Sequence, residues 1–163
     1  ALEIAVLDAV VPALDVAALT DEQILALVRG ADLTRMWGCG IGFAASNEDQ
    51  SVVVRVYAAD TGDPSFDDVR FPDPGWTATV SVGSLLMANH CDDVSEGWEA
   101  DPKEAVSLPV VAGTLSFTRR PDSLCGDDRA AANLTGATVL VGDSRVLFDE
   151  LALENDAFGC FAG

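Results

Sequence analysis

The alternation of apolar and polar residues predicts a chain made mainly of β-strands. The clearest case is residues 76–82, Trp-Thr-Ala-Thr-Val-Ser-Val, in which every second residue is apolar. Such alternation is typical of a strand with one buried and one wet face. Runs rich in β-branched and aromatic residues predict further strands at residues 37–45, 52–57, 134–141, 146–153 and 158–162. Residues 106–118 predict a strand pair or one bent strand, interrupted by Pro109 and Gly113.

Turn and loop signals separate these strands. Residues 46–50 and 142–144 read as polar turns, and residues 60–74, 89–103 and 119–129 as longer loops. Pro109 indicates an edge or a bulge, since proline cannot donate to a sheet ladder. A total of about seven to nine short strands predicts one antiparallel β-sandwich or a barrel-like variant of it. Strand and helix patterns do not alternate along the chain, which argues against a nucleotide-binding α/β fold.

One short helix is predicted near the N-terminus. Thr20 and Gln23 have the spacing of a capping box, and Gly30 is a suitable end for the helix. Residues 1–19 are apolar, but their pattern leaves helix and strand open, and Pro12 argues against one continuous helix. We therefore expect a single domain, 1–163, with an N-terminal segment (1–33) whose helix plugs one end of a β-sandwich body (34–163).

Two glycine-rich stretches resemble one another. Residues 36–43 read Met-Trp-Gly-Cys-Gly-Ile-Gly-Phe, and residues 158–163 read Phe-Gly-Cys-Phe-Ala-Gly. Glycines in strand-like runs often mark places where a backbone or ring comes close. The two stretches are candidates for neighbouring strands joined by a Cys39–Cys160 disulfide. Pairing elsewhere remains open, because sequence does not determine connectivity.

The four cysteines predict an oxidising compartment. They are Cys39, Cys91, Cys125 and Cys160, and no two have the C-x-x-C spacing of a zinc or iron–sulfur site. Two disulfides fit this pattern better. The first residue is Ala, as in a processed export product. No run approaches the roughly 20 apolar residues that span a bilayer. We expect an extracellular or cell-surface protein without membrane insertion.

The charge balance excludes nucleic acid as a partner. The chain has 27 acidic and 9 basic residues, a formal net charge of −18. Such a surface repels nucleic acid and attracts divalent cations and basic partners. A salt-rich habitat, or a genome poor in lysine codons, would produce the same imbalance with no role in binding.

Two groups of aspartates predict a calcium site, because calcium prefers carboxylate and carbonyl oxygens on loops. The first group lies in the loop 60–74, and the second follows Cys91 and Cys125, whose pairing would bring its members together. In order, the residues are Asp60, Asp63, Asp67, Asp68, Asp92, Asp93, Asp127 and Asp128. The alternative is that these aspartates keep the loops solvated and form Asx turns.

Trp76 and Trp98 border loops and are candidates for a carbohydrate platform, although a tryptophan is more often buried in a core. Catalysis has less support. The chain has one histidine, His90, and lacks G-x-S-x-G, H-E-x-x-H and phosphate-loop motifs. A hydrolase centred on His90 is the least favoured hypothesis, and we expect no enzyme.

The resulting hypothesis is a secreted or cell-surface β-sandwich that acts by binding or by self-assembly. In the assembly version, residues 1–19 pack along a neighbouring surface protein or second copy by β-augmentation. The alternative is a calcium-dependent carbohydrate-binding module, with a glycan as its partner and calcium as its cofactor.

Overall fold

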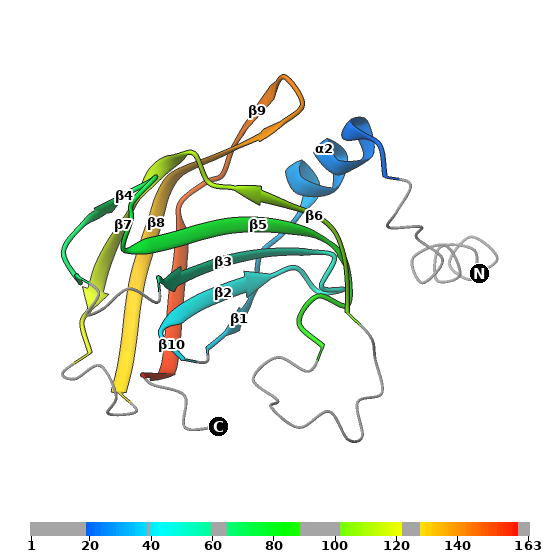
Figure 1. The fold of residues 1–163 in the computed structure, drawn as a ribbon. Helices are drawn as coiled ribbons and strands as arrows, with labels where there is room; N and C mark the ends of the chain where they lie inside the picture. Colours follow the sequence, from blue (N-terminus) through cyan, green and yellow to red (C-terminus); the bar gives the residue numbers. More distant parts are fainter. Residues whose placement is uncertain (1–18, 39, 60–64, 89–101, 122–127, 160–163) are drawn as a thin grey trace.

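The computed structural model describes residues 19–38, 40–59, 65–88, 102–121 and 128–159. They form two antiparallel sheets packed face to face, which confirms the predicted β-sandwich (Figure 1). Sheet A has the order β1 (Arg35–Trp37), β2 (Gly42–Ser46), β3 (Val52–Ala58), β5 (Trp76–Ser84) and β6 (Lys103–Pro109). Sheet B has the order β10 (Leu151–Phe158), β8 (Asp128–Val141), β7 (Ala112–Arg119) and β4 (Val69–Arg70), and β9 (Ser144–Leu147) also pairs with β8.

Most predicted strands are present, although some bounds differ. The predicted single strand 37–45 is wrong: β1 and β2 form a hairpin in which Met36 pairs with Ala45. The segment 106–118, predicted as a strand pair or one bent strand, is a pair, and the chain passes from sheet A to sheet B after Pro109. β4 and residues 128–129 of β8 fall in segments predicted as loops, and residues 130–133 extend the strand predicted at 134–141. These stretches lack the alternation of apolar and polar residues on which the prediction depended.

The core lies between the sheets, and β5 shows how alternation builds it. Trp76, Ala78, Val80 and Val82 are buried there, at 5% exposure or less. The Trp76 ring packs with Phe66, from the loop before β4, and with Phe117 of sheet B, whose ring centroid lies 5.5 Å away. Burying aromatic rings contributes much of a core's stability, so this cluster ties the two sheets together.

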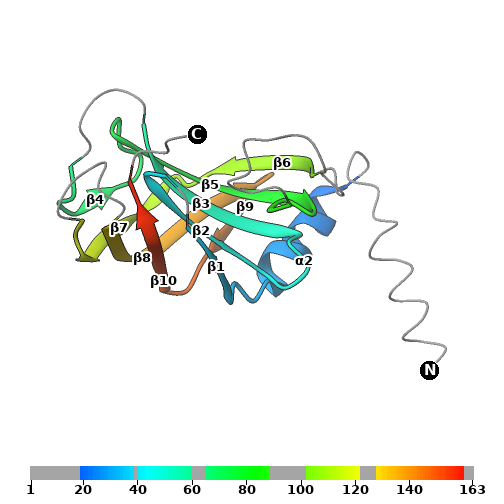
Figure 2. The same cartoon turned by 90° about the horizontal axis from the view of Figure 1, so that it is seen from below.

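Helix α2 (Asp21–Gly30) covers one end of the sandwich, next to β5 and the β8–β9 hairpin (Figures 1 and 2). The predicted capping box is present: the Gln23 amide donates to Thr20 Oγ1 at 3.2 Å. The Thr20 amide donates in return to Gln23 Oε1 at 2.9 Å. Ile24 and Val28 enter the core, and each buried side chain contributes about 1.5–3 kcal/mol. Among the described residues, no helix is both long and apolar enough to cross a membrane.

Asn155 joins the sheets along the edge formed by β10 and the β1–β2 hairpin. It is 1% exposed, and its Nδ2 donates to the carbonyl oxygens of Gly40 at 3.1 Å and Gly42 at 2.7 Å. Its Oδ1 accepts from the Ala157 amide at 2.9 Å. A Cβ on Gly38 would lie 2.5 Å from Asn155 Oδ1, so glycine makes room for this contact. The expectation that these glycines mark a close approach is confirmed.

A line of irregularities crosses sheet B. Gly113 in β7 has φ +129 and Gly136 in β8 has φ +66, and both interrupt regular pairing. Opposite Gly136, residues 149–150 leave the sheet, so the predicted strand 146–153 is split into β9 and β10. The hairpin predicted at residues 142–144 is present, and Val141 pairs with Ser144. This split opens the sheet beside α2.

Candidate functional site

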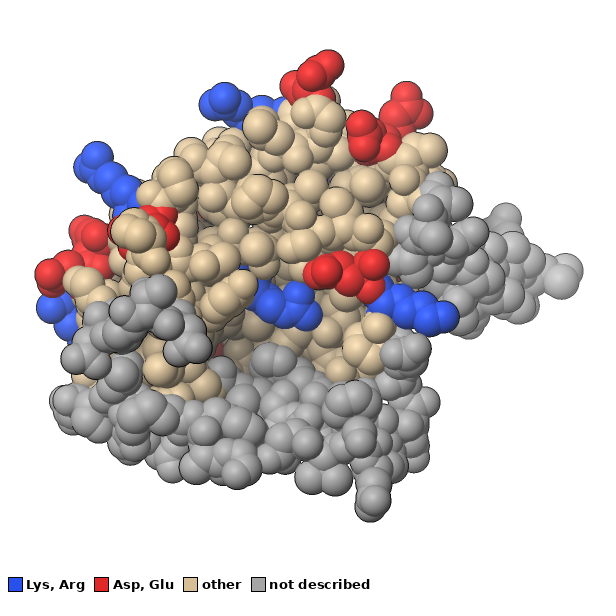
Figure 3. Space-filling view, viewed as in Figure 1, with Lys and Arg blue, Asp and Glu red and all other residues tan. Residues whose placement is uncertain are grey.

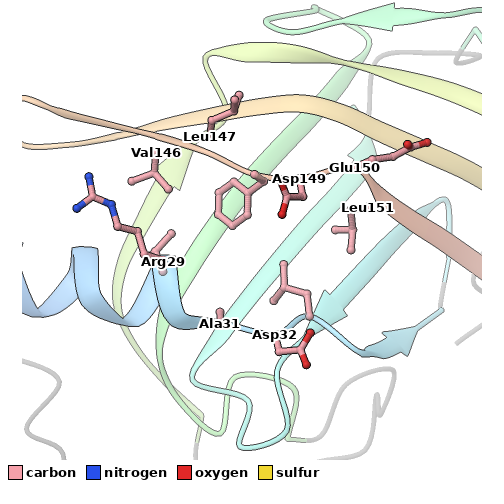
Figure 4. Close-up of a pocket in the computed structure, with 11 residues that line it drawn as sticks. Arg29, Ala31, Asp32, Val146, Leu147, Asp149, Glu150 and Leu151 are labelled. Atoms are coloured by element: carbon pink, nitrogen blue, oxygen red, sulfur yellow. The ribbon is translucent and has the colours of Figure 1, made fainter.

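A groove of about 320 Å3 lies between α2 and the link from β9 to β10 (Figure 4). We call it the α2 groove. It is lined by Val28, Arg29, Ala31, Asp32, Leu33, Val146, Leu147, Phe148, Asp149, Glu150 and Leu151. Its volume is at the lower end of the roughly 300–1,000 Å3 of small-molecule sites, enough for one or two side chains of a partner.

The groove exists because the β9–β10 link leaves the sheet. Phe148 is still bonded to β8, its amide donating to Ala137 O at 2.8 Å. Pairing resumes at Leu151, opposite Leu134. Between these points Asp149 and Glu150 turn toward solvent, and the apolar side chains on either side line the groove. The sequence therefore places two carboxylates at the edge of a groove whose floor includes apolar side chains but whose exposed surface is more polar than apolar.

Charges around the α2 groove are unevenly placed. The groove is lined by three exposed acids, Asp32, Asp149 and Glu150, and by one exposed base, Arg29. In Figure 4, Asp149 points from the β9–β10 link toward the α2 side, whereas Arg29 points away from Asp32. One end of the groove is thus acidic, while Arg29 lies in the last turn of α2, where a cation favours the helix dipole.

Leu147 lies on β9 beside the α2 groove, is 69% exposed, and points away from α2 in Figure 4. Leu140, on the neighbouring β8, is 44% exposed. Leu147 pairs with Thr138, two residues from Leu140, so the two leucines are diagonal neighbours on the outer face of the hairpin. The two leucines form a small exposed apolar patch beside the groove, of the kind that a partner can contact.

The outer face of sheet A carries a second notable group around Arg55. Its guanidinium donates to Ser81 Oγ at 3.0 Å and to Leu86 O at 3.1 Å. Ser81 donates to Glu104 Oε1 at 2.6 Å, and that carboxylate lies 4.0 Å from Arg55. Burial lowers the pKa of Arg55, with Glu104 and Tyr57 acting in the opposite direction. Arginine stays protonated at neutral pH in spite of such burial. Its contacts hold residues 85–88 against the sheet.

Beyond that loop the outer face of sheet A is open. Tyr57 is 44% exposed and pairs with Thr77, while Arg55 pairs with Thr79. These four side chains share the face opposite the core, since Val54 and Val56 point inward. Figure 3 views the molecule from this side, where uncharged side chains predominate. A tyrosine ring among hydroxyls is a surface that suits a neutral polar ligand.

A smaller hollow, of about 120 Å3, lies on sheet B beside Arg119, Arg129, Glu154 and Asp156. Arg129 Nε lies 3.9 Å from Asp156 Oδ1, with both side chains exposed. Bases and acids are mixed here, so the hollow has no dominant charge to attract a ligand.

Most of the predicted calcium ligands lie outside the described residues, namely Asp60, Asp63, Asp92, Asp93 and Asp127. For Asp128 only the backbone, at the start of β8, is described. Asp67 and Asp68 are exposed, and Asp67 Oδ1 lies 3.4 Å from the Arg120 guanidinium. Among the side chains that the structure describes, no three histidines, cysteines or acids are placed to hold a metal ion. The calcium site therefore stays a prediction.

The predicted carbohydrate platform at Trp76 is wrong. Its side chain is 2% exposed, and Nε1 donates to Ser65 O at 2.9 Å. A ring inside the core offers no face to a sugar; alternation already placed Trp76 on the inward side of β5. Trp98 and His90 lie outside the described residues, as do the four cysteines, Cys39, Cys91, Cys125 and Cys160.

The residues of the α2 groove were not predicted as a site. Residues 146–153 were predicted as one strand, so the prediction did not include the point at Asp149 and Glu150 where the chain leaves the sheet. Two adjacent acids between Phe148 and Leu151 break the expected alternation, and this was the available signal. No protein-family model, curated protein or solved structure matches the chain.

Proposed function

We propose that the chain is an exported or cell-surface β-sandwich that acts by binding and not by catalysis, and that the α2 groove is its binding surface. The observation that carries this proposal is the groove itself. It joins an apolar floor (Leu33, Phe148, Leu151) to an exposed leucine, Leu147, on a chain whose surface is otherwise rich in acids. Apolar side chains grouped in a concave, exposed position favour contact with a partner.

Export is the compartment that the cysteines favour. A hydrogen bond of 3.2 Å joins the Gly159 amide to Gly40 O, so the residues adjacent to Cys160 and Cys39 are close neighbours. This proximity supports the proposed Cys39–Cys160 disulfide, because the Cα atoms of paired cysteines lie roughly 4.4–6.8 Å apart. The proposal that Cys91 pairs with Cys125 rests on the sequence alone.

Amide chemical shifts of the 15N-labelled chain test the binding proposal. The labelled chain is titrated with an excess of unlabelled chain, and separately with short peptides that are apolar, apolar and basic, or apolar and acidic. We expect at least one titrant to shift amides of residues 28–33 and 146–151 more than those of β3. A groove whose amides respond to none of them would contradict the proposal.

Assembly of a second copy is the version that involves residues 1–19. The described edge strands carry residues that discourage simple edge pairing: Arg35 in β1, Arg70 in β4, Arg145 in β9, and the only lysine, Lys103, in β6. This favours contact through a groove over open-ended strand addition. Sedimentation should show size increasing with concentration, and a chain of residues 19–163 should lose that increase. A strict monomer with the same fold would remove this version.

A carbohydrate-binding module is the second candidate, and the outer face of sheet A favours it. Tyr57 supplies an exposed ring, and Thr77, Thr79 and Arg55 supply hydroxyls and a donor beside it. Glycan binding that is lost in Tyr57→Ala and kept in Leu147→Ser would support this face over the α2 groove. Binding unaffected by Tyr57→Ala would argue against it.

Calcium is the proposed cofactor of that second candidate. A thermal melt of the non-reduced protein, with calcium and then with EDTA at fixed ionic strength, tests it. A site filled at a hundredfold excess over its dissociation constant adds about 2.7 kcal/mol, which raises Tm by roughly 5–10 °C. An equal effect of sodium would mean that the aspartates only keep the loops solvated.

A further inference from the structure

We infer that the partner of the α2 groove is an extended segment of another protein in which apolar side chains are flanked by lysine or arginine. This inference rests on the proposed function, since it takes the groove to be the binding surface. The groove combines two features that such a segment matches at once. These features are an apolar floor and a rim with more acids than bases.

The floor selects an apolar side chain. Leu33, Phe148 and Leu151 are partly buried and pack on the core, while the hollow above them, of about 320 Å3, is open. One leucine- or phenylalanine-sized group would cover the apolar atoms that these three residues leave exposed. Leu147, exposed on the outer face of β9 beside the groove, would then contact the next apolar group along the segment.

The rim selects the charge that flanks this apolar group. Asp32, Asp149 and Glu150 are exposed around the groove, with Arg29 as the one base. The chain as a whole carries −18, so a basic segment is attracted from a distance as well as at contact. A second copy of this chain, or its own residues 1–18 with Glu3, Asp8 and Asp15, would bring more negative charge to an acidic rim.

The placement of Arg29 gives the segment a direction. Arg29 points away from the acidic end of the groove in Figure 4. A lysine or arginine of the partner fits beside Asp149 and Asp32 and is repelled near Arg29. Removing Arg29 should therefore strengthen binding, whereas removing the acids should weaken it. Simple attraction to a negatively charged protein would not distinguish the positions of these charges.

Fluorescence anisotropy with a labelled eight-residue peptide of alternating lysine and leucine tests this inference. Relative to the unchanged chain, we expect Asp149→Asn with Glu150→Gln to raise Kd about five-fold, because each exposed ion pair changes affinity by roughly two- to five-fold. Leu147→Ser should raise Kd by about three- to ten-fold. Arg29→Gln should lower Kd about two-fold.

The matched control is Glu48→Gln with Glu154→Gln, which removes the same charge from two exposed positions outside the groove. We expect its Kd to stay within two-fold of the unchanged chain. All these substitutions lie at exposed positions, and a urea midpoint equal to that of the unchanged chain verifies folding for each. A control that weakens binding as much as the groove variant would overturn the inference in favour of non-specific attraction.

Two further peptides separate this inference from the proposed function. Alternating lysine and serine keeps the charge without the apolar groups, and alternating glutamate and leucine keeps the apolar groups with the opposite charge. We expect neither to bind within tenfold of the lysine–leucine peptide. Groove amides that shift with the glutamate–leucine peptide, or with excess unlabelled chain, would overturn the basic partner and retain the groove. Amides that shift with no titrant would overturn both.

Discussion

Replacing Asn155 with alanine tests how the two sheets are held together at their β10 edge. The substitution removes three hydrogen bonds, to Gly40 O, to Gly42 O and from the Ala157 amide. The bond to Gly42 O is buried, so its loss leaves that carbonyl oxygen with neither the Asn155 donor nor water to bind, at a cost of about 1–3 kcal/mol. The other two bonds are partly buried, and water can replace them, so each loss costs about 0.5–1.5 kcal/mol.

These contributions predict a loss of roughly 4 kcal/mol in the free energy of unfolding. For a domain of 163 residues, such a loss lowers Tm by about 8–16 °C. Urea unfolding of the non-reduced protein, followed by tryptophan fluorescence, measures the free energy directly. The slope with urea should stay constant, because the surface exposed on unfolding is the same.

Asn133→Ala is the matched control. Asn133 is half-exposed on β8, on the face opposite Leu134, which lies in the core. The same atoms are deleted there without opening a buried contact, so the change should stay within about 0.5 kcal/mol. Equal free energies for Asn155→Ala and Asn133→Ala would refute the conclusion that Asn155 joins the sheets.

Three more predictions concern single positions. Gly42→Ala places a Cβ 2.7 Å from Val56 O and should cost about 1–3 kcal/mol, whereas Gly30→Ala, with nothing within 4 Å, should be neutral or stabilising by up to about 1 kcal/mol; urea midpoints compare them. Arg55→Met should cost about 1–3 kcal/mol in the same assay and speed amide exchange in residues 85–88, because Leu86 O loses a charged donor; unchanged exchange would contradict this. Peptide mapping of the non-reduced protein should recover Cys39 linked to Cys160; either cysteine found free, or in another pair, would exclude this disulfide.

Local patterns predicted the elements that depend on local physics. Thr20 and Gln23 form a capping box because their spacing places each beside the other's backbone amide in any helix that starts there. The alternation in residues 76–82 became β5 because successive side chains of a strand point to opposite faces. The same rule buried Trp76, so the sequence already argued against its use as a sugar platform.

The glycine-rich stretch shows where local patterns stop. Its glycines predicted a close approach, and the approach exists, but its partner is Asn155, more than 110 residues further along the chain. Alternation with Leu151 and Leu153 places Asn155 on the inward face of β10, but no local pattern predicts which carbonyl oxygens it contacts. Its burial depends on the β1–β2 hairpin and β10 meeting at one edge, which follows from how the sheets pack.

The sequence by itself determined the fold class, the one described helix and the acidic surface, because hydrophobic periodicity, capping and net charge are properties of neighbouring residues or of composition. Only the tertiary structure decided the α2 groove. Val28 and Leu33 come from one end of the chain, and Phe148, Asp149 and Leu151 come from the other. They meet because α2 packs on the core beside a sheet that Gly136 interrupts, and contacts between distant residues carry no signal in a local pattern.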